Sequence, residues 1–517
     1  MLCKIPEKRL QMFASLKRLV KHSAVYGIGH ILSRAIGFLL LPLYTNYLSP
    51  ASLGVSAIVF LYLALLTILY TYGLDAAFLR YYILSEAREE QERLFSTAFL
   101  TVFITSCAFS IWGYLNAGFL ADKILIANAK SLLSQISDPA ALDVAFKEAP
   151  TYFKLSSGIL FFDALSILPF LVLRAKERST LFVSLKLVNV IINLLLNILL
   201  VAKLGLGVKG IFMANFVSSG ITFLTTLPIV LGYLKPLYSL QEIKRLLAFG
   251  LPYIPSTLSV VLMDLVDRFI LKEIKGYEIL GIYHANYKIA MFMALLVAAF
   301  RFAWHPFFLS TSKEPQAKEI FAKVLSYFML ACAFVYICLS LFVEDLVKIK
   351  FGSIYLIGKE YWAGLGVVPV VMLAYILYGA YLNFLVGIYL KKKTGYLPFI
   401  TGAGLALNIA GNLLLIPRYG MYGAAWATVA SYLLMALLLF GVGEKLYPVR
   451  YEYGKLAKLA LVVALYGFAI YRFDFKFVTK VAVAGSFPAV LYIARFFDAR
   501  EIARLKALLK PAHSNLS

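Results

Sequence analysis

The chain has 517 residues, of which 62% are hydrophobic and only 15% are charged, and its formal net charge is +23. This balance is too apolar for a soluble globular protein and is typical of a polytopic membrane protein. The basic excess does not call for a nucleic acid partner, because the cytoplasmic loops of membrane proteins accumulate Lys and Arg.

Apolar runs, separated by charged residues or by Pro and Gly, predict about 14 membrane-spanning helices and therefore an all-α fold. The predicted limits are 24–48, 53–82, 94–119, 154–175, 180–202, 210–233, 247–271, 278–302, 322–345, 363–390, 395–416, 421–443, 455–471 and 478–494. An even number of spans places both termini on the same side of the membrane. The first run is long enough to span, so it predicts an uncleaved helix rather than a signal peptide.

The distribution of basic residues predicts the orientation. Lys and Arg are about twice as frequent in the segments that one orientation places inside as in its outer segments. The inner loops then include Arg174–Arg178 (RAKER) and Lys391–Lys393 (KKK), and no outer loop is as basic. We therefore predict a multi-pass protein of the cytoplasmic membrane with both termini in the cytoplasm.

Little of the chain lies outside the predicted spans. Residues 1–23 predict a basic cytoplasmic tail, and the longest loop, about 120–153, predicts a partly apolar surface helix followed by an acidic turn. Residues 495–517 predict a basic amphipathic helix on the anionic inner leaflet. No GxxxxGK[ST] run is present, which excludes transport driven by an ATPase of this chain. The four cysteines suggest neither a disulfide framework nor a metal site.

Two halves of the sequence echo each other. The segment from Thr180 (TLFVSLKLVNVIINLLLNILL) matches the segment from Thr394 (TGYLPFITGAGLALNIAGNLLL), with the asparagines at a constant offset of 215 and a slip of two residues before the glycines. The matched pairs are Asn193 and Asn408, Asn197 and Asn412, Gly207 and Gly420, and Gly210 and Gly423. A fainter echo relates Leu48–Val55 to Lys275–Ile282.

This repeat predicts two six-helix lobes related by a parallel pseudo-twofold axis: an N-lobe at 24–233 and a C-lobe at 247–443. Two further helices occupy 455–494. Two lobes that face each other across a central cavity suit alternating access around a site at mid-membrane. The alternative is that the repeated Asn and Gly residues only allow close helix packing.

Several charged residues lie within the predicted spans, where an uncompensated charge costs several kcal/mol. The basic ones are Arg34, Arg80, Lys186, Arg268, Lys288 and Arg301, and the acidic ones are Asp75, Asp163, Asp264 and Asp267. Arg34 and Lys288 lie about ten residues into their spans, close to mid-membrane, so we expect them to line a polar cavity. Arg80 and Arg301 lie near cytoplasmic ends, where they either bind substrate or extend to the headgroups.

Some of these charges have expected partners. Asp264 and Arg268 are four residues apart on one helix and can pair, which leaves Asp267 for a basic residue of another span. Asp75 is expected to pair with Arg34 or Arg80. A purely structural role for these charges is the alternative.

A polar stripe runs along the fifth predicted span. Its members are Lys186, Asn189, Asn193 and Asn197, spaced three or four residues apart. Such a stripe is too polar to face lipid, so it lines either a cavity or a seam between helices.

The excess of cations over acids within the spans favours an anionic substrate, and Arg suits a phosphate or pyrophosphate through forked hydrogen bonds. The predicted substrate-binding residues are Arg34, Arg80, Lys186, Asn193, Arg268, Lys288 and Arg301. The predicted ion-coupling residues are Asp75, Asp163, Asp264 and Asp267.

Three stretches resemble a known family. They are AVYGIGHILSRAIGFLLLPLYTNYLSPASLGV from Ala24, YGLDAAFLRYY from Tyr72, and FGLPYIPSTLSVVLMDLVDRFILKEIKGYEILGIYHANYKIA from Phe249. They resemble the polysaccharide (O-antigen type) flippases of the multidrug/oligosaccharidyl-lipid/polysaccharide exporter superfamily, and the similarity extends to about residue 443. Arg34, Asp75, Arg80, Asp267 and Arg268 lie in the matching motifs.

The resemblance implies twelve core helices in two lobes plus two extra helices. It also implies outward transport of polyprenyl-pyrophosphate-linked oligosaccharides, such as lipopolysaccharide O-antigen units, coupled to a proton or sodium gradient. No other cofactor is expected. Membrane lipid and, as further candidates, polysaccharide polymerases are the expected partners.

Three alternatives remain open at this point. A multidrug exporter of the same superfamily usually has acidic or apolar walls, which the excess of Lys and Arg disfavours. An exporter of a peptidoglycan lipid precursor fits the charge equally well. A membrane glycan polymerase or ligase is less favoured, because such an enzyme needs a sizeable outer loop or a catalytic cluster at one face; we therefore predict a transporter rather than an enzyme.

Overall fold

The computed structural model describes residues 38–85, 87–127, 138–312, 314–498 and 501. Four predictions fall wholly or partly outside these ranges: the basic N-terminal tail, most of the first span with Arg34, part of the surface helix in 120–153, and nearly all of the amphipathic C-terminal helix. Within the described ranges the regular structure is almost wholly helical, and the strands β1 (Lys350–Phe351) and β2 (Ile354–Tyr355) pair antiparallel as a small hairpin.

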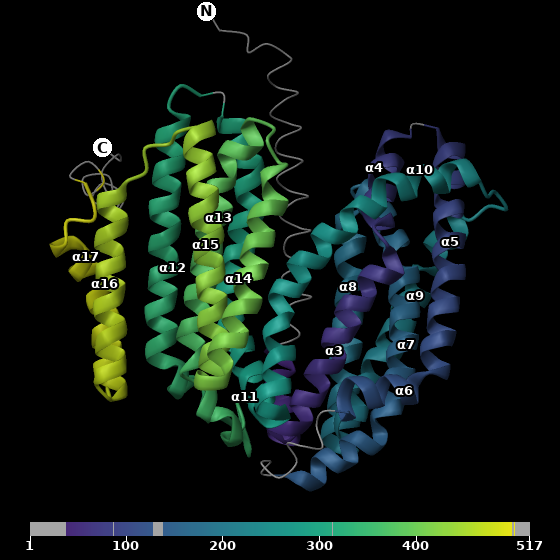
Figure 1. Ribbon diagram of the computed structural model, residues 1–517, viewed down its shortest axis with the longest axis horizontal. Coiled ribbons are helices and arrows are strands. Elements are labelled where there is room, and N and C mark those ends of the chain that lie inside the picture. The colour runs from purple at the N-terminus through teal and green to yellow at the C-terminus, as the bar shows by residue number, and fades with distance from the viewer. Residues whose placement is uncertain (1–37, 86, 128–137, 313, 499–500, 502–517) are drawn as a thin grey trace, which may run out of the picture.

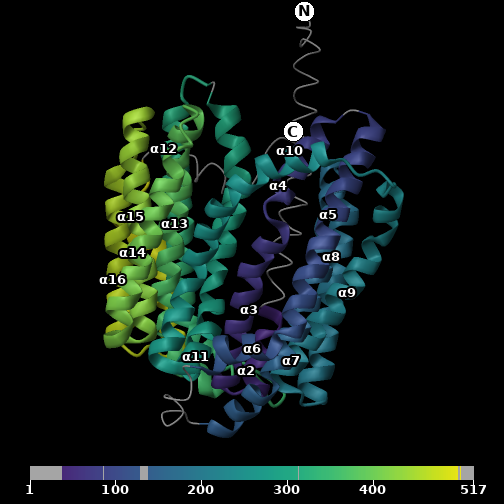
Figure 2. The same cartoon turned by 45° about the vertical axis from the view of Figure 1, so that its right-hand side comes forward.

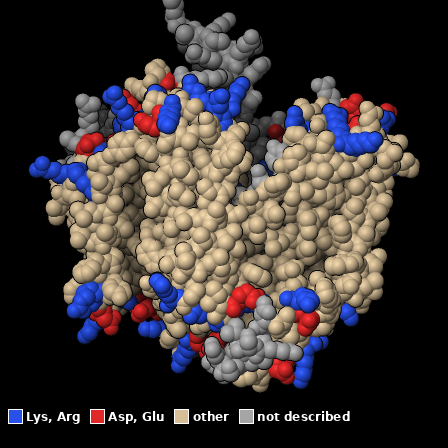
Figure 3. Space-filling view, in the orientation of Figure 1, with Lys and Arg blue, Asp and Glu red and all other residues tan. Residues whose placement is uncertain are grey.

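The described helices have the dimensions and composition of membrane spans. Eleven of them are long and apolar enough to cross a membrane, and the apolar α17 is somewhat shorter. Charged side chains gather at two opposite ends of the molecule, with an almost uncharged band between them (Figure 3). A continuous helix satisfies every backbone N–H and C=O internally, which is what a bilayer requires. The polytopic all-α fold class is therefore confirmed.

The first bundle, coloured purple to blue in Figure 1, is the N-lobe. Its elements are α2 (Leu41–Tyr47), α3 (Pro50–Thr71), α4 (Leu74–Leu84), α5 (Arg88–Leu115), α6 (Ala117–Ala121), the π-helix η1 (Asp122–Ile126), α7 (Pro139–Ala175), α8 (Ser179–Asn197), the π-helix η3 (Ile198–Lys203) and α9 (Gly207–Tyr233). The linker helix α10 (Leu240–Gly250) then packs against α4 at one end of this bundle.

The second bundle is the C-lobe, which Figure 2 shows beside the first. Its elements are α11 (Ile254–Thr311), which follows the short 3-10 helix η4 (Leu251–Tyr253), then α12 (Ala317–Val347), β1, β2, the 3-10 helix η5 (Lys359–Gly364), α13 (Val367–Leu390), α14 (Tyr396–Tyr419) and α15 (Met421–Leu446). Two last helices, α16 (Tyr453–Arg472) and α17 (Phe477–Ile493), pack against α12.

Two predicted span limits are wrong, each for a local reason. The predicted span 53–82 is two helices, because Tyr72 and Gly73 both adopt the left-handed conformation. Helix α7 begins at Pro139 rather than at residue 154, with the side chain of Asp138 capping its first turn. The predicted break between the spans 247–271 and 278–302 is present, because α11 consists of two helices that meet at Gly276, whose backbone is not helical (φ 81°).

The repeat is visible in the backbone of both lobes. Glu177 and Lys392, related by the offset of 215, both have a φ of 55° just after the ends of α7 and α13. Gly210 and Gly423 both press against the preceding helix, at Leu200 and Leu415, which the same offset relates. A side chain at Gly423 would collide with the backbone there, which explains the repeated glycine.

The repeated asparagines also have the same geometry. Asn197 Nδ2 donates to the backbone oxygen and to Oδ1 of Asn193 at 2.8 and 3.0 Å. Asn412 Nδ2 donates in the same way to Asn408 at 2.8 and 2.9 Å. These pairs stabilise the interiors of two equivalent helices, as the packing alternative predicted.

The two lobes meet at one end of the molecule, which we call the closed end. There α3 crosses the second half of α11, and Gly54 faces the carbonyl of Tyr277 while Gly281 faces the carbonyl of Pro50. An offset of 227 relates both Gly54 to Gly281 and Pro50 to Tyr277, so the crossing lies on the pseudo-twofold axis. Toward the opposite, open end the lobes diverge, and the surface is indented between them (Figures 1 and 3).

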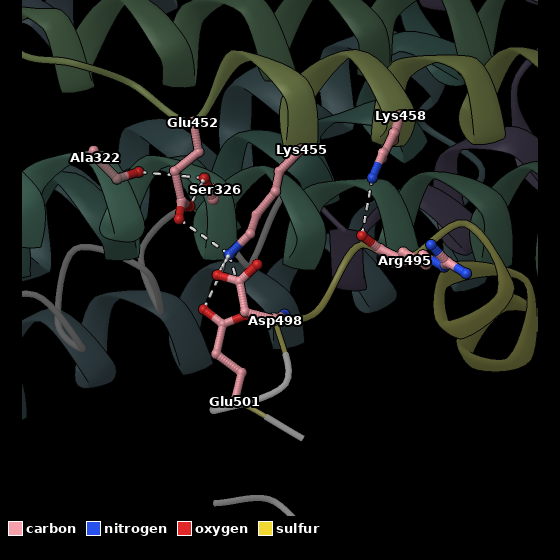
Figure 4. Close-up of polar contacts among 8 residues, drawn as sticks. All are labelled: Ala322, Ser326, Glu452, Lys455, Lys458, Arg495, Asp498 and Glu501. Carbon is pink, nitrogen blue, oxygen red and sulfur yellow. Dashed lines mark hydrogen bonds and ion pairs between the residues drawn. The ribbon is translucent and has the colours of Figure 1, made fainter. Parts of the chain in front are cut away.

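A charged cluster fixes α16 to the C-lobe (Figure 4). Lys455 Nζ lies 3.0 Å from Glu452 Oε1, 3.0 Å from Asp498 Oδ2 and 3.1 Å from Glu501 Oε1. Glu452 Oε2 in turn accepts a 2.6 Å hydrogen bond from Ser326 of α12. The cluster therefore joins α12, α16 and the segment after α17, with the Lys455 ammonium at its centre.

Candidate functional site

A charged group of the C-lobe is buried near mid-length of the first half of α11. Asp267 is 1% and Arg268 is 6% exposed. Asp267 Oδ1 accepts from the Arg268 backbone N–H at 2.7 Å and lies 3.5 Å from its Nη1, and Asp267 Oδ2 accepts from Tyr283 Oη at 2.6 Å. The Arg268 guanidinium also lies 4.4 Å from the ring centroid of Tyr287. Asp267 thus pairs with its own neighbour and a tyrosine, not with a base on another span as predicted.

Lys288 lies where the lobes face each other. Its Nζ is 5.7 Å from the ring centroid of Tyr44, on α2 of the N-lobe. Tyr44 Oη donates a 2.8 Å hydrogen bond to Asn197 Oδ1 on α8. One turn before Lys288, His284 Nδ1 has no hydrogen-bond partner in the described part of the chain. A cation, an imidazole and a tyrosine therefore stand together between the lobes.

The N-lobe has a charged group of its own. Asp163 of α7 and Lys186 of α8 interact electrostatically, and Ser219 of α9 hydrogen-bonds to Asp163. Lys186 Nζ also lies 4.2 Å from the ring centroid of Phe170. The Asp163 side chain is accessible to solvent.

The predicted polar stripe divides between helix seams and the N-lobe charged group. Asn189 donates to Ser218 O and Thr222 Oγ1 of α9 at 3.2 and 2.7 Å, and the Asn193–Asn197 pair is buried. These three asparagines belong to helix seams. Lys186 is half-buried and interacts with Asp163, so it is the member of the stripe that belongs to the N-lobe charged group.

The remaining predicted site residues lie elsewhere. Arg80 is exposed and stacks on Phe249 of α10, with 4.4 Å to the ring centroid, and so helps to hold the linker helix. Asp75 is also exposed and forms no ion pair within the described ranges. Arg301 lines a cavity inside the C-lobe. The side chain of Asp264 and all of Arg34 lie outside what the structure describes.

Contacts at the closed end tie the lobes together, and the sequence analysis did not find them. Lys272 Nζ donates to Ile124 O at 3.0 Å and Tyr277 Oη donates to Leu125 O at 2.8 Å, so two C-lobe side chains bind the π-helix η1 of the N-lobe. We call these two hydrogen bonds the interlobe latch. A π-helix leaves carbonyls free for such donors, but no pattern in the sequence marks it.

A second set of contacts lies across the pseudo-twofold axis. Thr45, which the offset of 227 relates to Lys272, accepts from the Gly358 backbone N–H at 3.1 Å. Tyr361 Oη donates to Leu48 O at 2.8 Å. In both sets a loop of one lobe binds the end of a helix of the other, so opening this end requires breaking hydrogen bonds on both sides.

The tyrosines of the site were not predicted individually. Tyr44, Tyr283 and Tyr287 contact the charged residues directly, but the chain has 34 Tyr and nothing in the sequence separates these three from the rest. The only signal in the sequence is their nearness to Lys288: Tyr287 directly precedes it, and Tyr283 lies five residues before it.

Two pseudosymmetric helical lobes that face each other around buried charges make this a polytopic, all-α membrane protein. The model of the family described as "Polysaccharide biosynthesis protein" matches residues 19–312, which is more than half of the chain. The chain therefore belongs to this family.

Solved structures agree with this fold. The lipid II flippase MurJ, in an inward closed conformation, is similar with a TM-score of 0.71 and 15% identity, over 94% of this chain and 100% of that chain. A multidrug resistance MATE family transporter of the MOP superfamily gives a TM-score of 0.60 in its inward-facing conformation, with 15% identity over 80% of this chain and 94% of that chain. Its outward-facing conformation gives 0.55, with 15% identity over 83% and 95%. None of the curated proteins matches.

Proposed function

We propose that this protein is a flippase that moves polyprenyl-pyrophosphate-linked oligosaccharides from the inner to the outer leaflet by alternating access. The observation that carries the proposal is the cationic group between the lobes, with Lys288 beside Tyr44 and the buried Arg268 one helix away. Cations in a medium of low dielectric constant attract a pyrophosphate strongly and exclude cationic drugs. Family membership supports a role in polysaccharide biosynthesis.

In this mechanism the head group enters between the lobes at the open end while the polyprenyl chain stays in the bilayer. Lys288 and Arg268 bind the pyrophosphate, with Lys186 and, outside the described residues, Arg34 as further ligands. Release requires the lobes to separate at the closed end, where Gly54 and Gly281 pack against opposite backbones and the interlobe latch is formed. The positive-inside prediction makes the open end cytoplasmic, with both termini on that side.

An ion gradient is the energy source that we propose, with Asp163 as the coupling residue of the N-lobe. Its carboxylate is accessible and interacts with Lys186. Binding of H⁺ or Na⁺ to Asp163 would release Lys186 for an anionic substrate, which links the two movements. Asp75 and Asp264 stay candidates from the sequence, whereas Asp267 is held by Arg268 and Tyr283 and is better suited to fixing Arg268.

A second candidate substrate is a peptidoglycan lipid precursor. The likeness to the lipid II flippase MurJ covers all of that chain, and lipid II is the ligand that its name gives. Both candidates make the protein a transporter rather than an enzyme, and both need the same cationic site. The polyprenyl-linked polysaccharide unit is preferred because the family model concerns polysaccharide biosynthesis.

The test is flipping of a fluorescent polyprenyl-pyrophosphate oligosaccharide in proteoliposomes of stated orientation. We expect the wild type to flip it and Lys288→Met to be slower by about tenfold or more, since one charge-assisted contact is lost. Lys154→Met is the matched control, because Lys154 also lies over a tyrosine ring, Tyr114, but far from the lobe interface. Transport of cationic dye without any flipping would overturn the proposal.

A further inference from the structure

The interior of the C-lobe contains two adjoining cavities that the steps above do not use. The first has a volume of about 330 Å³ and lies among α11, α13, α14 and α15. The second has about 420 Å³ and extends toward the open end of α11 and α13. Arg301, Tyr378, Tyr381 and Leu382 line both, so the cavities share a wall. Each volume is within the range of small-molecule sites, about 300–1,000 Å³.

Tyrosines dominate the first cavity. Tyr375, Tyr378, Tyr381 and Tyr432 line it, together with Thr401. The rings of Tyr378 and Tyr381 are stacked with centroids 5.9 Å apart, and those of Tyr378 and Tyr432 are 5.1 Å apart. Aromatic faces combined with hydroxyl groups bind a ligand that has both an apolar face and hydroxyls, and a pyranose ring is such a ligand.

Arg301 supplies the charge of these cavities. It is half-buried and forms no ion pair within the described ranges. Among the residues that the structure describes, no Asp or Glu lines either cavity. A planar guanidinium without a partner in a partly enclosed cavity suits a carboxylate, which it binds through two parallel hydrogen bonds.

Comparison with the N-lobe shows that the bundle fold does not require these tyrosines. The repeat relates three residues of the cavity wall to three of the N-lobe charged group: Tyr378 to Asp163, Thr401 to Lys186, and Tyr432 to Ser219. The same backbone therefore tolerates small polar and charged side chains at these positions. The tyrosines are a feature of the C-lobe, not a requirement of the bundle.

The cavity also connects with the midplane cations. Tyr375 Oη donates a 3.1 Å hydrogen bond to Tyr287 Oη, and the ring of Tyr287 lies under the Arg268 guanidinium. A ligand with its phosphates at Arg268 and Lys288 would thus have its first sugars within reach of Tyr375.

We propose that the C-lobe cavity binds an acidic sugar of the transported glycan, with the ring against Tyr378 and Tyr432 and its carboxylate on Arg301. This inference rests on the proposed function for its glycan, and it adds a preference for acidic over neutral repeat units. The charge complementarity comes from Arg301 alone, so that residue decides the preference while the tyrosines bind either kind of ring.

The test is calorimetric titration of the purified full-length protein with tetragalacturonate and with maltotetraose. We expect the wild type to bind tetragalacturonate about tenfold or more tightly, because a charge-assisted contact is added to stacking. Arg301→Gln should abolish this preference and leave maltotetraose unchanged. Tyr378→Leu should weaken the binding of both ligands. Tyr378→Phe, which keeps the ring, should preserve most of the binding and so shows that the position tolerates change.

Arg418→Gln is the matched control, since Arg418 is an exposed arginine of the same lobe at the end of α14. Equal effects of Arg301→Gln and Arg418→Gln would overturn the inference. The inference would also be overturned if Arg301→Gln lost binding of inorganic pyrophosphate but kept binding of tetragalacturonate. The anion at Arg301 would then be the phosphate. The flipping assay is read separately: flipping by wild type without an Arg301-dependent preference refutes only this inference, whereas preference without flipping of any lipid-linked glycan refutes only the proposed function.

Discussion

The two lobes carry different side chains at related positions of the same bundle. The related pairs are Asp163 and Tyr378, Lys186 and Thr401, and Ser219 and Tyr432. A fourth pair extends the contrast: Asn189 hydrogen-bonds to Thr222 in the N-lobe, whereas the related Gly404 packs against Met435 in the C-lobe. At these related positions the N-lobe is therefore charged and hydrogen-bonded, and the C-lobe is aromatic and apolar.

The contacts that the two lobes share explain why other side chains can differ between them. The Asn pairs, the glycine contacts at Leu200 and Leu415, and the left-handed residues Glu177 and Lys392 hold the helix ends and crossings in place. With the backbone fixed by these contacts, the side chains between them are free to diverge. This difference fits the roles that we propose, ion coupling in the N-lobe and contact with the glycan in the C-lobe.

The largest effect is expected from breaking the N-lobe charge pair. Lys186→Met leaves Asp163 without its cation in a medium where an unpaired charge is costly, so Asp163 should become protonated and cease to respond to the gradient. We expect flipping to fall by about a hundredfold, measured in proteoliposomes with an imposed gradient.

The control is the related change in the other lobe. Thr401→Met alters the C-lobe at the position that corresponds to Lys186 and should leave the dependence on the gradient intact. The double variant Asp163→Asn, Lys186→Met should be better folded than Lys186→Met alone, since no unpaired charge remains. Equal loss in Lys186→Met and Thr401→Met would contradict the assignment of coupling to the N-lobe.

The second prediction concerns the interlobe latch, because its two hydrogen bonds join the lobes directly. Removing both donors with Lys272→Met and Tyr277→Phe should shift the population toward separation at the closed end, by about thirtyfold for two lost hydrogen bonds of ~1 kcal/mol each. Distances between spin labels placed on η5 and α6 would measure the shift. A population unchanged from wild type would mean that the Gly54–Gly281 crossing and the hydrogen bonds of Thr45 and Tyr361 hold this end closed without the latch.

Much of this difference between the lobes could not be predicted from the sequence. The helical fold and the offset of 215 could be predicted, because hydrophobic runs and repeated Asn and Gly residues are local patterns. The break at Tyr72 could not, since it depends on Gly73 meeting Gly250 of the linker helix, where a side chain on either residue would collide with the opposite backbone. The partner of Asp267 was predicted wrongly because Tyr283 comes from the other half of α11, brought back by the turn at Gly276.

The candidate site divides in the same way. Lys186, Arg268 and Lys288 were predicted from their depth in apolar runs, and the structure places each beside an aromatic ring. The cavity tyrosines could not be predicted, because an apolar span rich in Tyr looks the same whether its hydroxyls face a cavity, a seam or the headgroups.

A smaller effect is expected from the asparagines that the lobes share. Asn197→Leu should lower the thermal midpoint more than Asn412→Leu does, because Asn197 Oδ1 also accepts from Tyr44, whereas Asn412 Oδ1 has no partner within the described ranges. A hydrogen bond between membrane helices contributes ~0.6 kcal/mol on average, so we expect a difference of a few degrees at most. Differential scanning fluorimetry in detergent, with Asn197→Asp and Asn412→Asp as paired controls of shape, would measure it.

The smallest effect is expected at α16, which packs against α12 of the C-lobe. Among the described helices, the N-lobe has no equivalent of it. Burial raises the pKa of Glu501, but the Asp498 backbone N–H and the Lys455 ammonium lower it more, so the net pKa lies below its usual value. A carboxyl group with a depressed folded-state pKa stabilises the fold above its unfolded pKa and loses that contribution as the pH falls through the folded value. The protection factor for hydrogen exchange at the start of α16, which corrects the exchange rate for the intrinsic rate at each pH, should therefore fall as the pH falls below about 4.5. Lys455→Met should remove this dependence, and an equal fall in α14, which lies outside the cluster, would show general acid unfolding instead.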